Sequence, residues 1–353
     1  MKKTLLAISL LGTFGIASAQ SASNVTVYGT LDAGVASTNG ANSAGTVTSV
    51  QSGQESYSRF GFKGTEDLGG GLKAIFDLEA GFELNNGTSG LTGIGNNVPA
   101  DQNNSLFSSQ AYVGLAGNFG TVKVGRQFSP LYEAYGSIDP FVNGFAANIN
   151  NFFGTDANNS SNYERMSNAA IYETPDNLYG FKGSVAYGFG GVAGDTSAQS
   201  QVGGSLGYLN GPLTVSYAFH QANNEQNGIP GASTDSFKTN FLGAAYDFGP
   251  VKAHLAFDQN QQGDTFKTQD YLVGVTVPIG AHAIFADYTH KDNKLIDNAN
   301  ADQYAIGYTY NFSKRTNFYT AYTYVKNQEN SLIDTEVAGN SVGTVQVGLR
   351  HSF

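Results

Sequence analysis

The chain has no cysteine among its 353 residues, so its fold is held without disulfide bonds. Charged residues are scarce, at 13%, and acidic ones outnumber basic ones, which gives a formal net charge of −10. An acidic excess argues against general binding to nucleic acid. Beyond the first residues the chain also has no run of about 18 apolar residues and no clear helical stripe, so we expect no membrane-spanning helix.

The first residues have the pattern of an export signal. Lys2 and Lys3 precede an apolar stretch that extends to Ile16, and Ala17-Ser18-Ala19 follows with small residues at the cleavage positions. This stretch is too short and wrongly flanked for a membrane anchor, so residues 1–19 are predicted to be a cleaved secretory signal peptide. Loss of the two lysines changes the formal charge from −10 to −12, and residues 20–353 form one predicted domain.

Glycine and aromatic residues are abundant where charge is not. The chain holds 45 glycines, 24 phenylalanines and 20 tyrosines, a composition that suits strands and turns better than helices. In residues 25–35, 72–84 and 301–312, apolar and polar side chains alternate. This two-residue period predicts strands with one apolar and one polar face.

The segments between such stretches alternate in length. Seven are short: 68–71, 118–120, 175–180, 210–212, 248–250, 279–281 and 313–315. Eight are longer and polar: roughly 38–54, 86–104, 130–165, 190–200, 222–234, 259–267, 291–301 and 326–341. These fifteen connections predict sixteen antiparallel strands. Short periplasmic turns at one end and long extracellular loops at the other are typical of a transmembrane β-barrel of the bacterial outer membrane.

The end of the sequence fits a barrel that closes on itself. An open edge would leave backbone groups unpaired in hydrocarbon at several kcal/mol each, so the strand near Asn24 is expected to pair with residues 342–353. Phe353 would then lie at the membrane interface on the short-turn side. Aromatic residues beside the short turns would form a girdle there: Phe119, Tyr179, Phe181, Phe248 and Phe312. A soluble secreted β-sandwich is the alternative, but it does not explain so many strands in which aromatic residues alternate with charge.

Three stretches resemble the trimeric general porins of Gram-negative outer membranes: "VTVYGTLDAG" (25–34), "SRFGFKGTEDLGGGLKAIFDLE" (58–79) and "GTVKVGRQFSPLYEAYGSIDPF" (120–141). The closing "VGLRHSF" is similar to the assembly signal of that family, whose final phenylalanine is read by the barrel-assembly machinery. The resemblance implies a homotrimer in the outer membrane, in contact with lipid and lipopolysaccharide, with both termini in the periplasm. It also implies passive diffusion of ions and small hydrophilic solutes, and a third loop folded into the lumen.

The longest connection, 130–165, supports that third loop independently. It contains Phe141, Phe145, Phe152 and Phe153, and a freely solvated loop seldom carries four phenylalanines. Packing against the inner wall would bury them and narrow the channel. An external adhesive loop is the alternative.

Charged residues near this loop are the candidates for a pore constriction. Arg59 and Lys63 lie on the face opposite Phe60 and Phe62, so they point inward if the phenylalanines face lipid. Arg126 has the parity of a lipid-facing residue, where a charge would cost about 2–4 kcal/mol. A bulge near Gly125 is therefore expected to turn it inward.

The resemblance adds Arg165, so that Arg59, Arg126 and Arg165 would form one wall of the constriction, with Glu133 and Asp139 opposite. The arginines could instead pair with loop carboxylates and hold the loop in place. Because these local charges outweigh distant ones, we expect a weak anion preference despite the negative net charge.

Other functions find weak support. The five histidines do not form a metal-binding spacing such as H-E-x-x-H, and no nucleophile motif marks an enzyme. Gly69-Gly70-Gly71 is a turn between strands and no phosphate-binding loop, so neither catalysis nor a cofactor is expected. A barrel acting mainly as an adhesin or receptor through its long loops remains an alternative, as does a substrate-specific channel.

Overall fold

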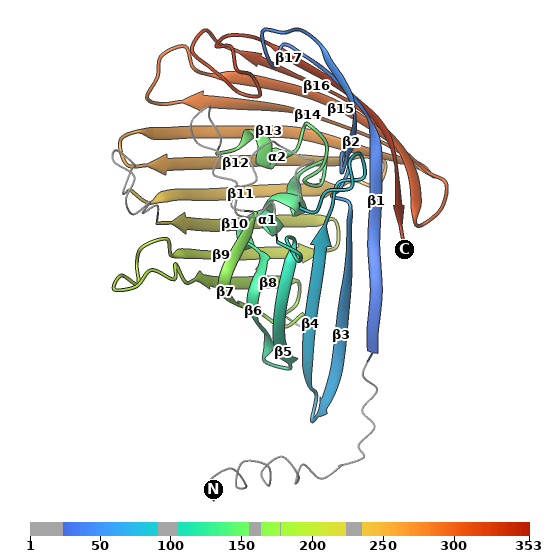
Figure 1. Cartoon of the computed structure of the whole chain (residues 1–353), viewed down its shortest axis with the longest axis vertical. Coiled ribbons are helices and arrows are strands. Elements are labelled where there is room, and N and C mark those ends of the chain that lie inside the picture. The colour runs from blue at the N-terminus through green and yellow to red at the C-terminus, as the bar shows by residue number, and fades with distance from the viewer. Residues whose placement is uncertain (1–23, 91–104, 155–163, 177, 224–234) are drawn as a thin grey trace, which may run out of the picture.

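The computed structural model describes residues 24–90, 105–154, 164–176, 178–223 and 235–353, so the expected signal peptide lies outside the described residues. The described part consists of strands and two short helices that lie inside the curve of the sheet (Figure 1). The strands are β1 (Asn24–Asn39), β2 (Val47–Ser52), β3 (Arg59–Gly69), β4 (Leu72–Gly81), β5 (Gln110–Gly117), β6 (Gly120–Phe128), β7 (Arg165–Glu173), β8 (Phe181–Gly188), β9 (Gln201–Asn210), β10 (Leu213–Ala222), β11 (Phe237–Asp247), β12 (Lys252–Gln262), β13 (Phe266–Ile279), β14 (His282–Asn293), β15 (Ala301–Asn311), β16 (Thr316–Asn327) and β17 (Val342–Ser352). The helices are α1 (Pro130–Ile138) and α2 (Ile149–Phe152), and no described helix is long and apolar enough to cross a membrane.

The sheet closes into a barrel of antiparallel strands. β1 pairs with β17 from Thr30↔Ser352 to Asn39↔Gly343. Beyond this register, Gly29 and Phe353 exchange two backbone hydrogen bonds, of 3.0 and 3.2 Å. The predicted pairing of the first and last strands is therefore confirmed, and it leaves no free sheet edge in hydrocarbon.

The barrel has the sixteen strands that the connections predicted, although the described residues form seventeen separate segments. The first half of β1, Asn24 to Thr30, pairs with β3, and residues 33–38 pair with β2. β2 and β3 are thus two parts of one barrel strand, interrupted at residues 53–58.

The seven short connections are all present between consecutive strands, but two of the longer ones differ from the prediction. Residues 47–52, expected in a loop, form β2. The long connection predicted at 259–267 is wrong, because β12 and β13 pair as far as Gln262↔Phe266 and leave a three-residue turn. Asn260 and Thr268 are polar because they face the barrel interior, where both are buried. A polar stretch therefore resembled a loop although its backbone is a regular strand.

The two faces of the strands separate as the alternation predicted. Val25 and Val27 are exposed on the outer face, whereas Asp32 on the other face of β1 is buried. The aromatic residues expected in a girdle are all exposed beside the short turns: Phe119, Tyr179, Phe181, Phe248 and Phe312. An apolar outer band flanked by aromatic residues is the surface that a barrel presents to lipid.

The third loop folds into the barrel, as predicted. The Ser129 hydroxyl accepts a hydrogen bond of 3.1 Å from the Tyr132 amide, and Pro130 occupies the first turn of α1, so the helix begins with a capped end. α1 packs against β8 to β12. The four phenylalanines of the loop are between 0 and 3% exposed: Phe141, Phe145, Phe152 and Phe153.

Candidate pore constriction

The third loop rests on an apolar part of the inner wall. Leu131, Tyr135 and Ile138 of α1 form one buried cluster with wall residues that include Phe241 and Leu272. Burial of apolar surface contributes about 25 cal/mol per Å², so this cluster stabilises the loop against the wall.

Glycines in the wall let the loop approach closely. A side-chain carbon added to Gly243 would lie 2.7 Å from Cγ1 of Ile138. One added to Gly274 would lie 2.5 Å from Cγ of Pro140. Both distances are too short for carbon atoms, so these positions accommodate the loop because they lack a side chain.

The second half of the loop is held by aromatic contacts. Phe141 meets Phe285 of β14 edge to face, with ring centroids 4.8 Å apart, and Phe145 meets Tyr319 of β16 at 5.4 Å. Such pairs contribute about 0.5–1.5 kcal/mol each beyond their area burial. The loop therefore covers the inner faces of β8 to β16, and the open lumen lies on the side of β3 to β7.

Hydrogen bonds to buried carboxylates of the wall also hold the loop. Lys291 Nζ lies 3.0 Å from Asp270 Oδ1, and the other carboxylate oxygen of Asp270 accepts a 3.0 Å hydrogen bond from the Gly154 amide. The Tyr135 hydroxyl donates to Asp258 at 2.8 Å. A buried carboxylate is tolerated when it is paired and hydrogen-bonded in this way.

Asp139 does not face the lumen, contrary to the sequence-based expectation. It is 3% exposed, and its carboxylate accepts hydrogen bonds from the amides of Phe141, Asn143 and Ile149 at 2.9, 3.0 and 3.2 Å. Burial raises the pKa of Asp139 to about 6, against the effect of these hydrogen bonds. Asp139 shapes the turn after α1 because a carboxylate can accept several backbone N–H groups at once.

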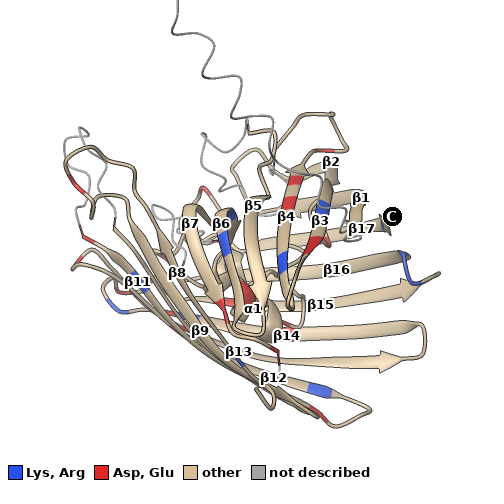
Figure 2. Cartoon of the chain, turned by 90° about the horizontal axis from the view of Figure 1, so that it is seen from below, with Lys and Arg blue, Asp and Glu red and all other residues tan. Residues whose placement is uncertain are grey.

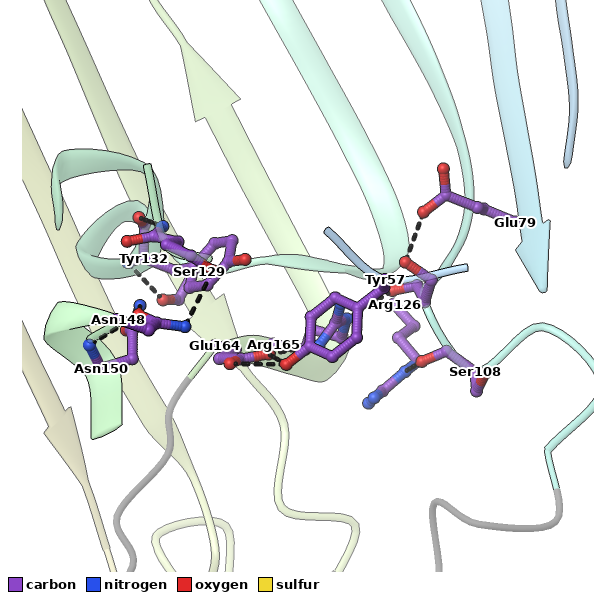
Figure 3. Close-up of polar contacts among 12 residues, drawn as sticks. Tyr57, Glu79, Ser108, Arg126, Ser129, Tyr132, Asn148, Asn150, Glu164 and Arg165 are labelled. Atoms are coloured by element: carbon purple, nitrogen blue, oxygen red, sulfur yellow. Dashed lines mark hydrogen bonds and ion pairs between the residues drawn. The ribbon is translucent and has the colours of Figure 1, made fainter. Parts of the chain in front are cut away.

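Arg165 also lies elsewhere than expected, because its side chain is only 6% exposed. Its Nη1 pairs with Glu164 at 2.6 Å and its Nε donates to the Ser109 carbonyl at 3.1 Å. The guanidinium lies over the rings of Tyr57 and Phe128, 5.2 and 4.7 Å from their centroids. Figure 3 shows this group enclosed between Tyr57 and Glu164. Arg165 therefore fits the alternative, in which the arginine pairs with a carboxylate and holds the loop in place, better than a role in lining the pore.

The bulge expected near Gly125 is present as a register shift between Gly125 and Gln127. It does not turn Arg126 inward. Arg126 pairs with Ala111, two residues from the exposed, outward-facing Val113. Its Nε donates to the Ser108 carbonyl and its Nη1 to the Ser167 hydroxyl, both at 2.7 Å. The guanidinium is thus hydrogen-bonded where β6 meets the third loop.

Arg59 and Lys63 do point to the interior, as their parity predicted. Arg59 Nε lies 3.1 Å from Glu79, and its Nη1 donates to the Tyr57 carbonyl at 2.9 Å. The Arg59 side chain stays 30% exposed, whereas that of Glu79 is 4% exposed. Lys63 is exposed, with its Nζ 4.7 Å from the centroid of the Tyr28 ring.

Four further charged residues belong to this site although the sequence-based prediction did not include them: Asp77, Glu79, Lys123 and Glu173. Asp77 is buried and accepts a 2.7 Å hydrogen bond from the Tyr28 hydroxyl. Lys123 pairs with Glu173 at 2.5 Å. Their place in the alternating sequence pattern could have identified them as inward-facing, because inward positions of β4 and β6 alternate with outward apolar ones.

Glu133 lies on the exposed side of α1. The surrounding barrel leaves little bulk water near its carboxylate, and this desolvation raises the pKa of Glu133 to about 7. Glu173 of β7 adds to the rise and Lys123 of β6 opposes it, so Glu133 lies within electrostatic reach of both strands. Of the two predicted loop carboxylates, Glu133 is therefore the exposed one and Asp139 the buried one.

Of the interior charges, those of β12–β14, such as Asp270 and Lys291, are buried under the third loop, whereas Arg59 and Lys63 on β3 remain partly or fully exposed. Figure 2 shows basic and acidic segments on β3, β4 and β6, whereas β15 and β16 are uncharged over almost their whole length. Within the described ranges, no group of three or more histidine, aspartate or glutamate residues could hold a metal ion. The arrangement suits the passage of hydrated solutes past interleaved charges.

Comparison with known proteins agrees with this architecture. The family model described as "Gram-negative porin" matches residues 5–330. An outer membrane porin protein of Bordetella pertussis is 34% identical over the whole of both chains, and outer membrane porin protein 32 of Delftia acidovorans is 33% identical over the same extent. Among solved structures, an anion-selective porin from Comamonas acidovorans has 30% identity and a TM-score of 0.79, with 94% of this chain and 100% of that chain covered. The chain belongs to the Gram-negative porin family and forms a diffusion channel in the outer membrane.

Proposed function

We propose that the channel passes small hydrophilic solutes with a weak preference for anions, set by Arg59 and Lys63 on β3. The observation that carries this proposal is the difference in exposure within the charged pairs. Arg59 is 30% exposed and Lys63 is exposed, while Glu79 and Asp77 beside them are buried. A permeating ion therefore meets the cations more directly than the carboxylates that hold them.

Glu133 opposes this preference from the third loop. Two unit charges about 4 Å apart interact by about 4 kcal/mol at an effective dielectric of 20, so charges in the constriction outweigh those in the loops. Charges on the exposed outer loops act weakly at the constriction, because salt screens exposed charges over about 8 Å. The similar porin from Comamonas acidovorans is anion-selective, which supports the same sign for this chain.

The reversal potential of single channels across a salt gradient tests the proposal. The wild-type channel should favour anions weakly at low salt, and the preference should fade as the salt concentration rises. Lys63→Gln should move the reversal potential toward cation preference. Lys326→Gln is the matched control, because Lys326 is an exposed lysine on the outer parity of β16. A wild-type channel that favours cations at low salt would contradict the proposal.

We also propose that three copies assemble and that Phe353 guides insertion into the membrane, as the family resemblance implies. The Phe353 ring lies against Gly29, where an added side-chain carbon would collide with it, so the two strand ends fit together at this rim. Deletion of Phe353 should lower the yield of folded barrel in outer-membrane fractions, measured by heat-modifiable migration. An undiminished yield would remove the assembly role and leave the channel function unaffected.

A further inference from the structure

Residues 53–58, which interrupt the strand formed by β2 and β3, make an inward turn that we call the strand break. We propose that the strand break is a second constriction element beside the third loop, and that Asp32 on β1 is its positioning residue. The inference rests on the proposed constriction and adds to it a second wall segment. Gln54, Tyr57 and Ser58 of the strand break are buried, which shows that the turn lies within the barrel.

Asp32 holds the backbone of the strand break. Its carboxylate accepts hydrogen bonds from the amides of Gln54, Glu55 and Ser56 at 3.3, 2.9 and 2.8 Å. It also accepts one from the Tyr319 hydroxyl at 2.5 Å. Asp32 is 0% exposed, so its charge depends on these donors in place of water. Bonds between a carboxylate and N–H groups are stronger than neutral ones, which makes Asp32 an effective anchor.

The strand break in turn supports the tip of the third loop. The Phe145 amide donates a 2.5 Å hydrogen bond to the Gln54 carbonyl. Gly144 lies so close to the Glu55 carbonyl that an added side-chain carbon would overlap it. On the other side of the tip, the Ala146 amide donates to Oε1 of Gln346 at 2.7 Å. The tip is therefore held between the strand break and β17.

Three arginines contact the same turn. Arg350 Nη1 lies 3.3 Å from Glu55, which also accepts a 2.7 Å hydrogen bond from Asn317. Arg59 donates to the Tyr57 carbonyl, and the Arg165 guanidinium lies over the Tyr57 ring. A shift of the strand break would move both the tip of the loop and these charges.

Unit conductance of inserted channels distinguishes positioning from stability. A residue that only stabilises the barrel changes how many channels insert, whereas a positioning residue changes what each channel conducts. Asp32→Asn replaces an ionic acceptor by a neutral one and should raise unit conductance by roughly 1.5-fold, because the narrowest segment loosens. The matched control is Asp302→Asn, since Asp302 accepts hydrogen bonds from Tyr288 and His290 on the outer parity of β15.

A second variant tests the contact without touching Asp32. Gly144→Ala should force the loop tip away from Glu55 and change unit conductance in a folded channel. Gly183→Ala is its control, because an added carbon there meets its nearest neighbours at an ordinary 3.5 Å.

If Asp32→Asn inserts no channels, Gly144→Ala decides the question. Unit conductance equal to that of wild type in Gly144→Ala would overturn the inference. The Lys63→Gln experiment measures ion selectivity, whereas the variants described above are judged by unit conductance. A negative result for selectivity therefore leaves the test of the strand break unaffected.

Discussion

The inner faces of β3–β7 and of β9–β16 differ in what lies against them. On β3–β7, charged side chains border the open lumen: Arg59, Lys63, Asp77, Glu79, Lys123 and Glu173. On β9–β16, alanine, leucine and phenylalanine side chains are covered by the third loop. Both halves present the same kind of apolar outer face to the membrane. The barrel can therefore be uniform toward lipid while one half of its interior serves as a protein core and the other as a channel wall.

This difference between the two halves explains why the third loop packs against β9–β16. The apolar half provides a surface that the loop can bury, and Gly243 and Gly274 leave room there for Ile138 and Pro140. The loop also covers the Asp270–Lys291 pair, whose charges are compensated by hydrogen bonds. Covering the exposed Arg59 and Lys63 as well would require desolvation of further ions, at several kcal/mol per buried ion. The loop thus narrows the channel from one side and leaves Arg59 and Lys63 in contact with water.

Removal of residues 141–153 should have the largest effect, because it deletes the tip and α2 and uncovers part of the apolar half. We expect unit conductance to rise by roughly two-fold in channels that insert. Planar-bilayer recording measures this directly. A deletion of residues 190–196, in the connection between β8 and β9, serves as the control for shortening a loop. Equal conductance in the 141–153 deletion and wild type would mean that the loop does not limit the current.

Gly243→Ala should produce the next largest effect. The new carbon would lie 2.7 Å from Ile138, and overpacking of this kind costs about 1–3 kcal/mol. We expect a lower free energy of unfolding and a moderate rise in conductance, because α1 is displaced from the wall. Gly207→Ala is the control, since its nearest neighbour would be 3.4 Å away. Unchanged stability and conductance in Gly243→Ala would contradict the close fit of helix and wall.

Acidification should shift ion selectivity by a smaller amount. The pKa of Glu133 is raised to about 7, above the usual value of 4.5. Roughly nine-tenths of the Glu133 carboxylates are ionised at about pH 8 and roughly one-tenth at about pH 6. The anion preference should therefore increase as the pH falls across this range, measured as a change in reversal potential. The step should be absent in Glu133→Gln, and an identical step in that variant would assign the effect to another group.

Lys182→Gln should have the smallest effect. It compares a charge at the mouth of the barrel with the charges in the constriction. Lys182 pairs with Asp176 at 2.9 Å at the short-turn end of β8, with side chains 57% and 88% exposed. Exposed pairs contribute about 0–1 kcal/mol, and salt screens their field within about 8 Å. We expect no measurable change in stability or selectivity. A shift as large as that of Lys63→Gln would show that charges at the mouth also control selectivity.

The strand count and sidedness of the barrel could be predicted because both depend on local patterns. A two-residue period places apolar side chains outward at every strand, and short turns mark one end. The prediction failed at 259–267, where polar residues face the interior of a strand and resemble a loop. It also missed β2, because residues 47–58 combine a short strand with the strand break.

The site was only partly predictable for the same reason. The direction of Arg59 and Lys63 follows from strand parity. Arg126 also keeps its outward parity, against the prediction that a bulge would turn it inward. The positions of Arg165 and Asp139 do not follow from parity, because they depend on a buried ion pair and on backbone hydrogen bonds within the third loop. No local pattern indicates that Asp32 will meet Glu55 or that Ile138 will meet Gly243.

The sequence by itself therefore determined an outer-membrane barrel with sixteen strands, its lipid-facing surface and a long third loop rich in phenylalanine. These features follow from the requirement that every backbone group be paired in hydrocarbon. Only the tertiary structure decided which half of the interior is covered and which charges remain in the lumen. That outcome depends on contacts between residues far apart in the chain, such as Tyr135 with Asp258 and Phe145 with Tyr319. Burial and pairing at those contacts are properties of the closed barrel and of no single segment.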